Sequence, residues 1–174
     1  MSRIRITIYA IYGIVGFLVG FSFILPNTYT VYRDTLIDAQ ADKIHHYVGD
    51  LDQWPNWTTW KKHDPSLAIN VLKPKGKGAN QRWLGASGTG SLTFIREETW
   101  YGVDYDLIID NNPPSRASIL YSLKDEKTHV EWTMKGVVDI PVAGPYMAMM
   151  MDGMLGNMLA ENLESLKLVV EQNN

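Results

Sequence analysis

No charged residue occurs between Ile6 and Tyr32, and this stretch constrains the chain more than any other feature. Its first twenty residues, Ile6 to Leu25, are dominated by Ile, Val, Leu, Phe and Tyr. A helix of that length, at about 1.5 Å per residue, spans roughly 30 Å, which is the thickness of the hydrocarbon core of a bilayer. Pro26 then ends the run. The sequence therefore predicts a membrane-spanning helix at the N-terminus.

A cleaved signal peptide is the alternative to an anchor. Its apolar part would be shorter and would end in a small-x-small site, whereas this run continues into Phe-Ile-Leu-Pro-Asn-Thr-Tyr. We therefore divide the chain into an anchor, residues 1–27, and one domain, residues 28–174. Arg3 and Arg5 precede the helix, and the next basic residue is Arg33. The positive-inside bias then predicts a single-pass protein of the cell membrane with a cytoplasmic N-terminus and a periplasmic or extracellular domain.

The predicted helix carries a Gly-x-x-x-Gly pair at Gly16 and Gly20, with Gly13 about one turn earlier. Small residues at this spacing let two membrane helices approach closely. We therefore expect this face to pack against a second copy or against another transmembrane protein. The alternative is that glycine is simply frequent in membrane helices.

The charge balance of the domain excludes a nucleic-acid surface. The chain has 16 basic and 19 acidic residues, and without Arg3 and Arg5 the domain keeps 14 basic residues, a net charge of −5. Binding of nucleic acid needs clustered positive charge. Cysteine is absent from the sequence, so the fold has no disulfide and no thiolate ligand. The expected partners are the lipid bilayer and apolar molecules, and nucleic acid is not among them.

Metal-binding and catalytic motifs are also missing from the sequence. The Gly-rich segment 85–90 is interpreted as a hairpin or a bulge rather than a phosphate cradle, because no helix follows it. No His-x-x-x-His or Glu-x-x-His pair is formed by the four histidines, which are His45, His46, His63 and His129. We therefore expect no metal, no cofactor and no catalytic residue.

The first part of the domain reads as one strand and two short helices. Thr28 to Asp38 alternates and is rich in β-branched and aromatic residues, which favours a strand. Asp38 is placed to cap a helix that ends at Val48. The segment that follows carries three tryptophans at a spacing of three, which stacks their rings along one side of a helical turn; these are Trp54, Trp57 and Trp60.

The middle of the domain consists of short alternating runs separated by Gly, Pro or Asn. Links this short make antiparallel hairpins, because parallel crossovers need a dozen or more residues. In the last run Val130, Trp132 and Met134 share one face, which predicts a sheet with one apolar side that needs a cover. The six predicted strands are residues 68–72, 81–85, 90–97, 102–110, 115–123 and 128–137.

One element is long enough to provide that cover. Pro145 to Glu171 has no internal proline and would form a helix of about 40 Å. Its apolar stripe is Leu155, Leu159, Leu163, Leu166 and Val170. The predicted fold class is therefore α+β: a curved antiparallel sheet of about seven strands wrapped on a long C-terminal helix, plus the transmembrane helix.

An ordered set of motifs in the domain resembles a known superfamily. The motifs are Ile37-Asp-Ala-Gln-Ala-Asp-Lys-Ile, Asp52-Gln-Trp-Pro-Asn-Trp57, His63-Asp-Pro65, Gly76-Lys-Gly78 leading to Trp83, Gly88-Thr-Gly90, Thr128-His-Val-Glu-Trp132, Met151-Asp-Gly-Met-Leu-Gly156 and Glu161-Asn-Leu-Glu-Ser-Leu-Lys167. In order and spacing they are similar to the START-like superfamily, also called SRPBCC or polyketide cyclase/dehydrase-like. The resemblance covers nearly all of residues 29–171, and the membrane helix is a departure from it.

This resemblance implies a helix-grip fold in which the sheet and the long helix enclose an apolar cavity. Methionine adapts to irregular apolar shapes, and six methionines crowd the start of the C-terminal helix. The alternative is that these side chains form ordinary core. The candidate cavity-lining residues, on the sheet and on that helix, are Trp83, Tyr105, Tyr121, Trp132, Met134, Met150, Met154 and Met158.

Three functional hypotheses follow from the sequence. The first is a membrane-anchored binding module for a hydrophobic small molecule or lipid. The second is an accessory subunit of a membrane protein complex that uses the transmembrane helix and the surface of the domain. The third is an enzyme of the cyclase or hydrolase type, which would need a polar residue with a perturbed pKa inside the cavity. No such residue stands out in the sequence.

Overall fold

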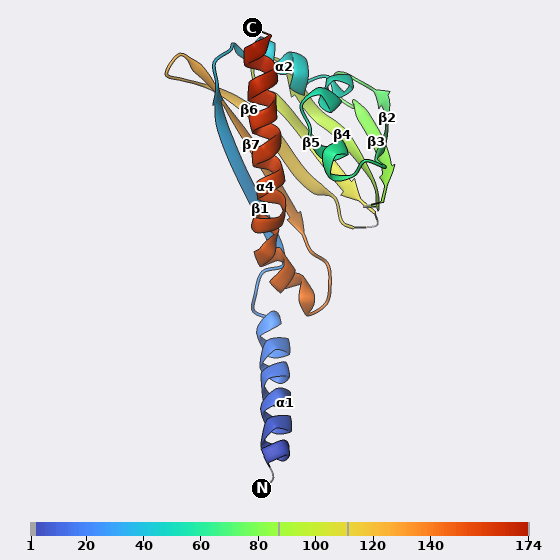
Figure 1. Cartoon of the computed structure of the whole chain (residues 1–174), viewed down its shortest axis with the longest axis vertical. Coiled ribbons are helices and arrows are strands. Elements are labelled where there is room, and N and C mark those ends of the chain that lie inside the picture. Colours follow the sequence, from blue (N-terminus) through green and yellow to red (C-terminus); the bar gives the residue numbers. More distant parts are fainter. Residues whose placement is uncertain (1–2, 87, 111, 174) are drawn as a thin grey trace.

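The computed structural model describes residues 3–86, 88–110 and 112–173, and Figure 1 shows an N-terminal helix followed by a domain of one sheet and one long helix. Near the N-terminus of the domain, three short helical segments connect the first two strands. In chain order the elements are α1 (Arg3–Ser22), β1 (Thr28–Ile37), α2 (Ala41–Val48), η1 (Leu51–Asn56), α3 (Trp60–His63), β2 (Ala68–Lys73), β3 (Asn80–Gly85), β4 (Gly88–Glu98), β5 (Gly102–Ile109), β6 (Ser115–Lys124), β7 (Lys127–Val137) and α4 (Ala143–Gln172).

The seven strands form one antiparallel sheet in the order β1-β7-β6-β5-β4-β3-β2. Strands β2 to β7 are a meander, so each pairs with its neighbour in sequence, and β1 then closes on β7. The register sets alternate residues on opposite faces: Val130, Trp132 and Met134 are buried, and the side chains between them are not. This alternation confirms the predicted inner face of the sheet.

Helix α4 covers that inner face, as Figure 1 shows for the C-terminal part of the helix. Its buried residues follow a spacing of three and four and include Leu159, Leu163, Leu166 and Val170. The Lys167 ammonium donates to the Leu36 carbonyl oxygen at 2.7 Å, which fixes the helix against β1. The predicted α+β helix-grip architecture, with a curved antiparallel sheet and a long C-terminal helix, is confirmed.

The centre of the core is aromatic. Trp54 and Trp57 are fully buried, and their indole N–H groups donate to the carbonyl oxygens of Val48 (2.9 Å) and Tyr47 (3.1 Å). Each ring therefore satisfies its polar atom within the α2–η1 segment. The tryptophan rings cluster as predicted, because the Trp54 ring contacts those of Trp57 and of Trp60 at centroid distances of 5.2 and 5.5 Å. They do not stack along one helical turn: the rings are tilted or edge-on, and Trp54 lies in η1 whereas Trp60 begins α3.

Two predicted helix boundaries are wrong. Helix α1 ends at Ser22, three residues before Leu25, because the residues preceding Pro26 are disfavoured from continuing a helix. The backbone amides of Phe23 and Ile24 donate hydrogen bonds to carbonyl oxygens three residues earlier, which forms a last turn of the 3₁₀ type at the end of the helix. Helix α2 begins at Ala41 after Gln40, so Asp38 does not cap it. The Asp38 amide instead donates to the Glu171 carboxylate at 2.9 Å.

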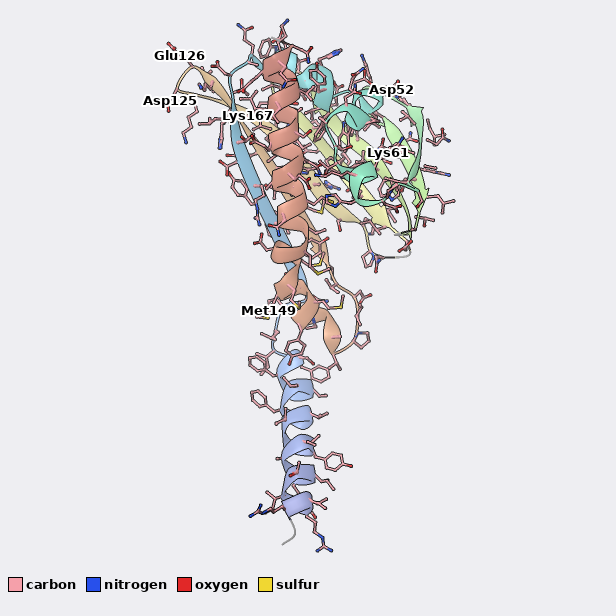
Figure 2. The ribbon with its side chains drawn as sticks, in the orientation of Figure 1. Asp52, Lys61, Asp125, Glu126, Met149 and Lys167 are labelled. Atoms are coloured by element: carbon pink, nitrogen blue, oxygen red, sulfur yellow. The ribbon has the colours of Figure 1, made fainter. Side chains whose placement is uncertain are left out.

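Helix α1 projects from the domain with its side chains exposed (Figure 2). Within the described residues it is the one helix whose length and apolar composition suit a bilayer span. Its glycine face is open: a Cβ atom added at Gly13, Gly16 or Gly20 would meet no heavy atom within 4 Å. The fold of the domain therefore makes no use of this face.

Candidate functional site

The inner face of the sheet is not completely filled. A half-open cavity of about 270 Å³ lies between the sheet, the short helix α3 and the middle of α4. Its walls are mostly apolar and aromatic, as ligand pockets generally are. The lining residues are Trp60, His63, Asp64, Leu67, Trp83, Leu92, Tyr105, Leu107, Ile109, Trp132, Met134, Leu155 and Met158.

Strand alternation positions the floor of the cavity. Tyr105 and Leu107 on β5, and Trp132 and Met134 on β7, occupy inward positions two residues apart. Trp83 on β3 lies opposite Gly90 on β4, and a Cβ atom at Gly90 would overlap the Trp83 ring. The absence of a side chain at this position therefore lets the indole lie flat across the neighbouring strand.

The roof of the cavity comes from α3 and α4. The Trp60 ring reaches across to Trp83 at a centroid distance of 6.1 Å. Thr59, just before α3, is held to α4 because its backbone amide and its hydroxyl both donate to the side-chain oxygen Oδ1 of Asn162, at 2.6 and 3.0 Å. Asn162 is fully buried. This buried amide therefore fixes the position of the Trp60 ring relative to the helix.

One buried polar group belongs to the floor of the cavity. The Trp132 indole N–H donates to the Tyr105 hydroxyl oxygen at 2.9 Å, and both side chains are 1 % exposed. Burial raises the pKa of the Tyr105 hydroxyl, so the hydroxyl keeps its proton at neutral pH. Among the described residues this proton has no acceptor. The hydroxyl can therefore donate to an oxygen or nitrogen of a bound molecule.

The open side of the cavity is polar. His63 shares a hydrogen bond with the Glu161 carboxylate at 2.8 Å, and Lys62 donates to the same carboxylate at 2.7 Å. The hydrogen bond from Lys62, and to a smaller extent the one from His63, lowers the pKa of the Glu161 carboxyl group. Asp64 accepts from the amide and the hydroxyl of Ser66. Of these residues, the exposed His63 and the buried Asp64 line the cavity, so its wall is polar on the α3 side.

Five of the eight predicted lining residues lie together around this cavity. They are Trp83, Tyr105, Trp132, Met134 and Met158. Their assignment as ligand contacts remains a prediction, because the structure holds no ligand. Alternation along the strands and residue spacing along α4 were enough to predict that these five side chains face the same interior space.

The other three predicted lining residues lie elsewhere. Met150 and Met154 are 63 % and 61 % exposed, because they lie on the side of α4 that faces away from the core, whereas Ala148, Met151 and Leu155 on the same stretch pack inward. Tyr121 is on the inner face but at the far end of β6, where α2 covers it: its ring packs edge-on against His45 at a centroid distance of 6.0 Å. The prediction that these three line the cavity is wrong.

Tyr121 borders a different hollow, of about 500 Å³, between the start of α2 and the β6–β7 turn. This hollow is larger than the first, but four of its nine lining residues are in turns or loops, and Trp100 and Leu123 are largely exposed. Beneath it the His45 imidazole pairs with Glu97 at 2.5 Å. Burial raises the pKa of the Tyr121 hydroxyl, and the negative charge of Glu97 raises it further. The smaller aromatic cavity is the better candidate site, because nearly all of its lining residues are buried or half-buried.

Several cavity residues were not predicted from the sequence. Trp60, Leu155 and the apolar strand residues were recognised as apolar positions, but they carried no sign of bordering a space. His63, Asp64 and Leu67 come from α3 and the turn after it, whose position over the β3–β4 end of the sheet depends on the Thr59–Asn162 contact. That contact joins residues 103 apart in sequence, and no local pattern indicates it.

The described residues contain no group of three or more His, Cys, Asp or Glu side chains that could hold a metal ion. Among the residues that line the cavity, no nucleophile is paired with a base. The cavity offers a ligand apolar contact, ring stacking and one hydroxyl donor.

Neither family models nor curated proteins match this chain in sequence. Solved structures do match its fold. Protein SA2116 from Staphylococcus aureus, described as a protein of unknown function, aligns with a TM-score of 0.66 at 8% identity over 84% of this chain and 95% of its own. TTHA0849 from Thermus thermophilus aligns with a TM-score of 0.60 at 14% identity over 83% and 99%.

Ara h 8.0201 aligns with a TM-score of 0.59 at 11% identity over 84% of this chain and 99% of its own. Each of these proteins is therefore matched over nearly its whole length by most of this chain. At such low identity the likeness concerns the fold alone. Together with the seven-stranded antiparallel sheet and the covering C-terminal helix, it shows that this chain has the helix-grip fold.

Proposed function

We propose that this protein is a membrane-tethered binding module for a small hydrophobic molecule that carries a hydrogen-bond acceptor. The observation that supports it most is the aromatic cavity with the Tyr105 hydroxyl in its floor. Contact with buried apolar walls gives a ligand affinity but does not orient it, and a single polar group can fix its orientation. The helix-grip likeness to solved structures agrees with a container but names no ligand.

The size of the cavity restricts the ligand. About 270 Å³ is near the lower end of the roughly 300–1,000 Å³ range of ligand pockets. At ~30 Å³ for each water molecule it holds about nine waters. A fused two-ring molecule or a short acyl chain fits this space, whereas the two chains of a whole phospholipid do not. The ligand is therefore a small apolar molecule or one short chain of a lipid.

The membrane tether is the second part of the proposal. Helix α1 has the length and composition of a membrane span, with Arg3 and Arg5 at its start. We propose that the N-terminus is cytoplasmic and that the domain lies on the periplasmic or extracellular side, following the positive-inside bias. Only five residues, 23–27, separate α1 from β1, so the domain would stay close to the bilayer, where apolar molecules concentrate.

Native mass spectrometry of the full chain, extracted from its membrane in mild detergent, tests the proposal. We expect the protein with one small apolar adduct, and we expect the Leu155→Trp variant, whose larger ring fills the cavity, to lose it. Leu168→Trp is the matched control, because Leu168 is exposed on the same helix away from the cavity. A cavity-filled variant that keeps the adduct would show that the molecule binds elsewhere.

A role as an accessory subunit is the second candidate, and the open Gly13, Gly16 and Gly20 face of α1 favours it. In that case the same spectra would contain a stoichiometric protein partner, or a dimer of this chain. Replacing Gly16 and Gly20 by isoleucine would remove that partner, since close approach of two helices needs small residues.

A further inference from the structure

The uncharged part of helix α1 is a few ångströms shorter than a typical hydrocarbon core. From Ile6, the first residue after the two arginines, to its end at Ser22 it rises about 25 Å. A typical hydrocarbon core is about 30 Å thick. About 5 Å of apolar surface is therefore missing at the domain end, and mismatch of this size has a cost. The structure places apolar side chains from the domain at that level.

Helix α4 begins close to the domain end of α1 (Figure 1). The Tyr146 hydroxyl donates to the Leu18 carbonyl oxygen at 2.6 Å, so a side chain of α4 reaches α1 one turn before α1 ends. Figure 2 shows Met149 on α4 just above the end of α1. If α1 spans the bilayer, the start of α4 is below the outer limit of the hydrocarbon core.

The surface at this level is apolar. We call it the collar; it consists of exposed residues after α1 and around the start of α4, namely Phe23, Ile24, Ile140, Val142, Met149 and Met150. Phe23 is 81 % and Met149 68 % exposed. An exposed apolar patch bordering a membrane helix is unfavourable in water and favourable in lipid.

Charged residues mark the upper edge of the collar. Between Asp139 and Asp152 the sequence contains no Lys, Arg, Asp or Glu. The Asp152 carboxylate pairs with Arg33 at 2.8 Å and lies about 9 Å along α4 from Tyr146. Val138, next to Asp139, donates its amide to the Asn27 carbonyl oxygen beyond the end of α1. Neither charge belongs to the collar, so placing the collar in lipid does not require burying a charged side chain.

From the short helix, the Tyr146–Leu18 bond and this distribution of charge, we infer that the collar is embedded in the domain-side leaflet of the bilayer and completes the membrane span. This inference rests on the membrane part of the proposed function and is independent of the cavity. It commits to lipid as the occupant, since the collar continues the surface of the membrane helix. A consequence is that α4 stands upright on the bilayer, with Leu155 about 14 Å along the helix from Tyr146.

Depth-dependent fluorescence quenching of the full chain in phosphatidylcholine nanodiscs tests this inference. Because the chain has no cysteine, single variants label cleanly. Met149→Cys reports on the collar, Phe17→Cys on the membrane helix, and Leu168→Cys on an exposed position near the other end of α4. Quenchers are brominated lipids for the hydrocarbon region and iodide for water.

We expect the Met149 and Phe17 labels to be quenched by brominated lipid and protected from iodide, with the Leu168 label showing the reverse. Iodide quenching of Met149 equal to that of Leu168, with Phe17 still quenched by lipid, would overturn the collar but leave the anchor intact. Protection of Met149 from both quenchers would also overturn it, because a protein would then cover the collar. Iodide quenching at Phe17 would refute the anchor itself.

Discussion

The Tyr105–Trp132 hydrogen bond gives a quantitative test of how the cavity floor is built. Tyr105→Phe removes the hydroxyl and leaves the Trp132 indole N–H without a partner at a site that is 1 % exposed. An orphaned buried donor costs about 1–3 kcal/mol. For a domain of this size a loss of about 2 kcal/mol lowers the melting temperature by roughly 4–10 °C.

The assay is thermal or urea unfolding of the full chain, followed by tryptophan fluorescence. Tyr29→Phe is the matched control, because the Tyr29 hydroxyl bonds Ser115 at 2.9 Å in a half-buried site that water can reach; we expect a loss of at most about 0.5 kcal/mol there. In the double variant Tyr105→Phe/Trp132→Phe the orphaned donor is gone. The double variant should therefore lose less stability than the sum of the losses in the two single variants, by about 1–2 kcal/mol. Additive losses, or equal losses at Tyr105 and Tyr29, would refute the reasoning.

Three further predictions concern backbone and charge. Gly90→Ala places a Cβ atom in the Trp83 ring and 2.8 Å from the Ile108 carbonyl oxygen, so we expect urea unfolding to show a free energy of unfolding lower by about 1–3 kcal/mol. Gly153→Ala is the control: its Cβ meets nothing within 4 Å, so the free energy of unfolding should rise by about 0.5–1 kcal/mol. Val142 has φ of 62°, which is strained for a β-branched residue, so Val142→Gly should raise the melting temperature; an unchanged or lower value contradicts this. Hydrogen bonding to Arg33 lowers the pKa of Asp152. The pair therefore stabilises the fold at pH values above the pKa that the carboxyl has in the unfolded chain, and this stabilisation is lost as the pH falls through its pKa in the folded protein. Asp152→Asn should lower the melting temperature at neutral pH and flatten its dependence on acidic pH, and an unchanged profile would show that the pair contributes nothing.

Most of the fold could be predicted from the sequence because its determinants are local. Alternation in the strands identified the inner face, and the leucine stripe of α4 identified the side that covers it. The predicted hairpin at residues 85–90 is also present, with Gly85 paired to Gly88. These patterns depend on neighbouring residues, and a short link between two strands leaves antiparallel pairing as the sole arrangement.

The shape of the cavity could not be predicted, because it depends on how α4 is rotated over the sheet. Met150, Met154 and Met158 are four residues apart, and at about 3.6 residues per turn such a row drifts around the helix, so only Met158 faces the cavity while Met151 packs against the core. The rotation of the helix is fixed by long-range contacts such as Thr59–Asn162. The end of α1 at Ser22 is a similar case: composition gave the apolar run, and the turn before Pro26 decided how much of it is helical.

The central claim is that a small apolar molecule with an acceptor group occupies the cavity. Its most direct test is a titration of the full chain, labelled with ¹³C-methyl methionine in nanodiscs, with 2-acetylnaphthalene, a two-ring ketone. Met134 and Met158 line the cavity, whereas Met149 and Met150 are in the collar. The account predicts saturable methyl shifts at Met134 and Met158 that the Leu155→Trp variant abolishes, with no saturable shift at Met149 or Met150. Unchanged Met134 and Met158 signals, or shifts that survive in that variant, would contradict it.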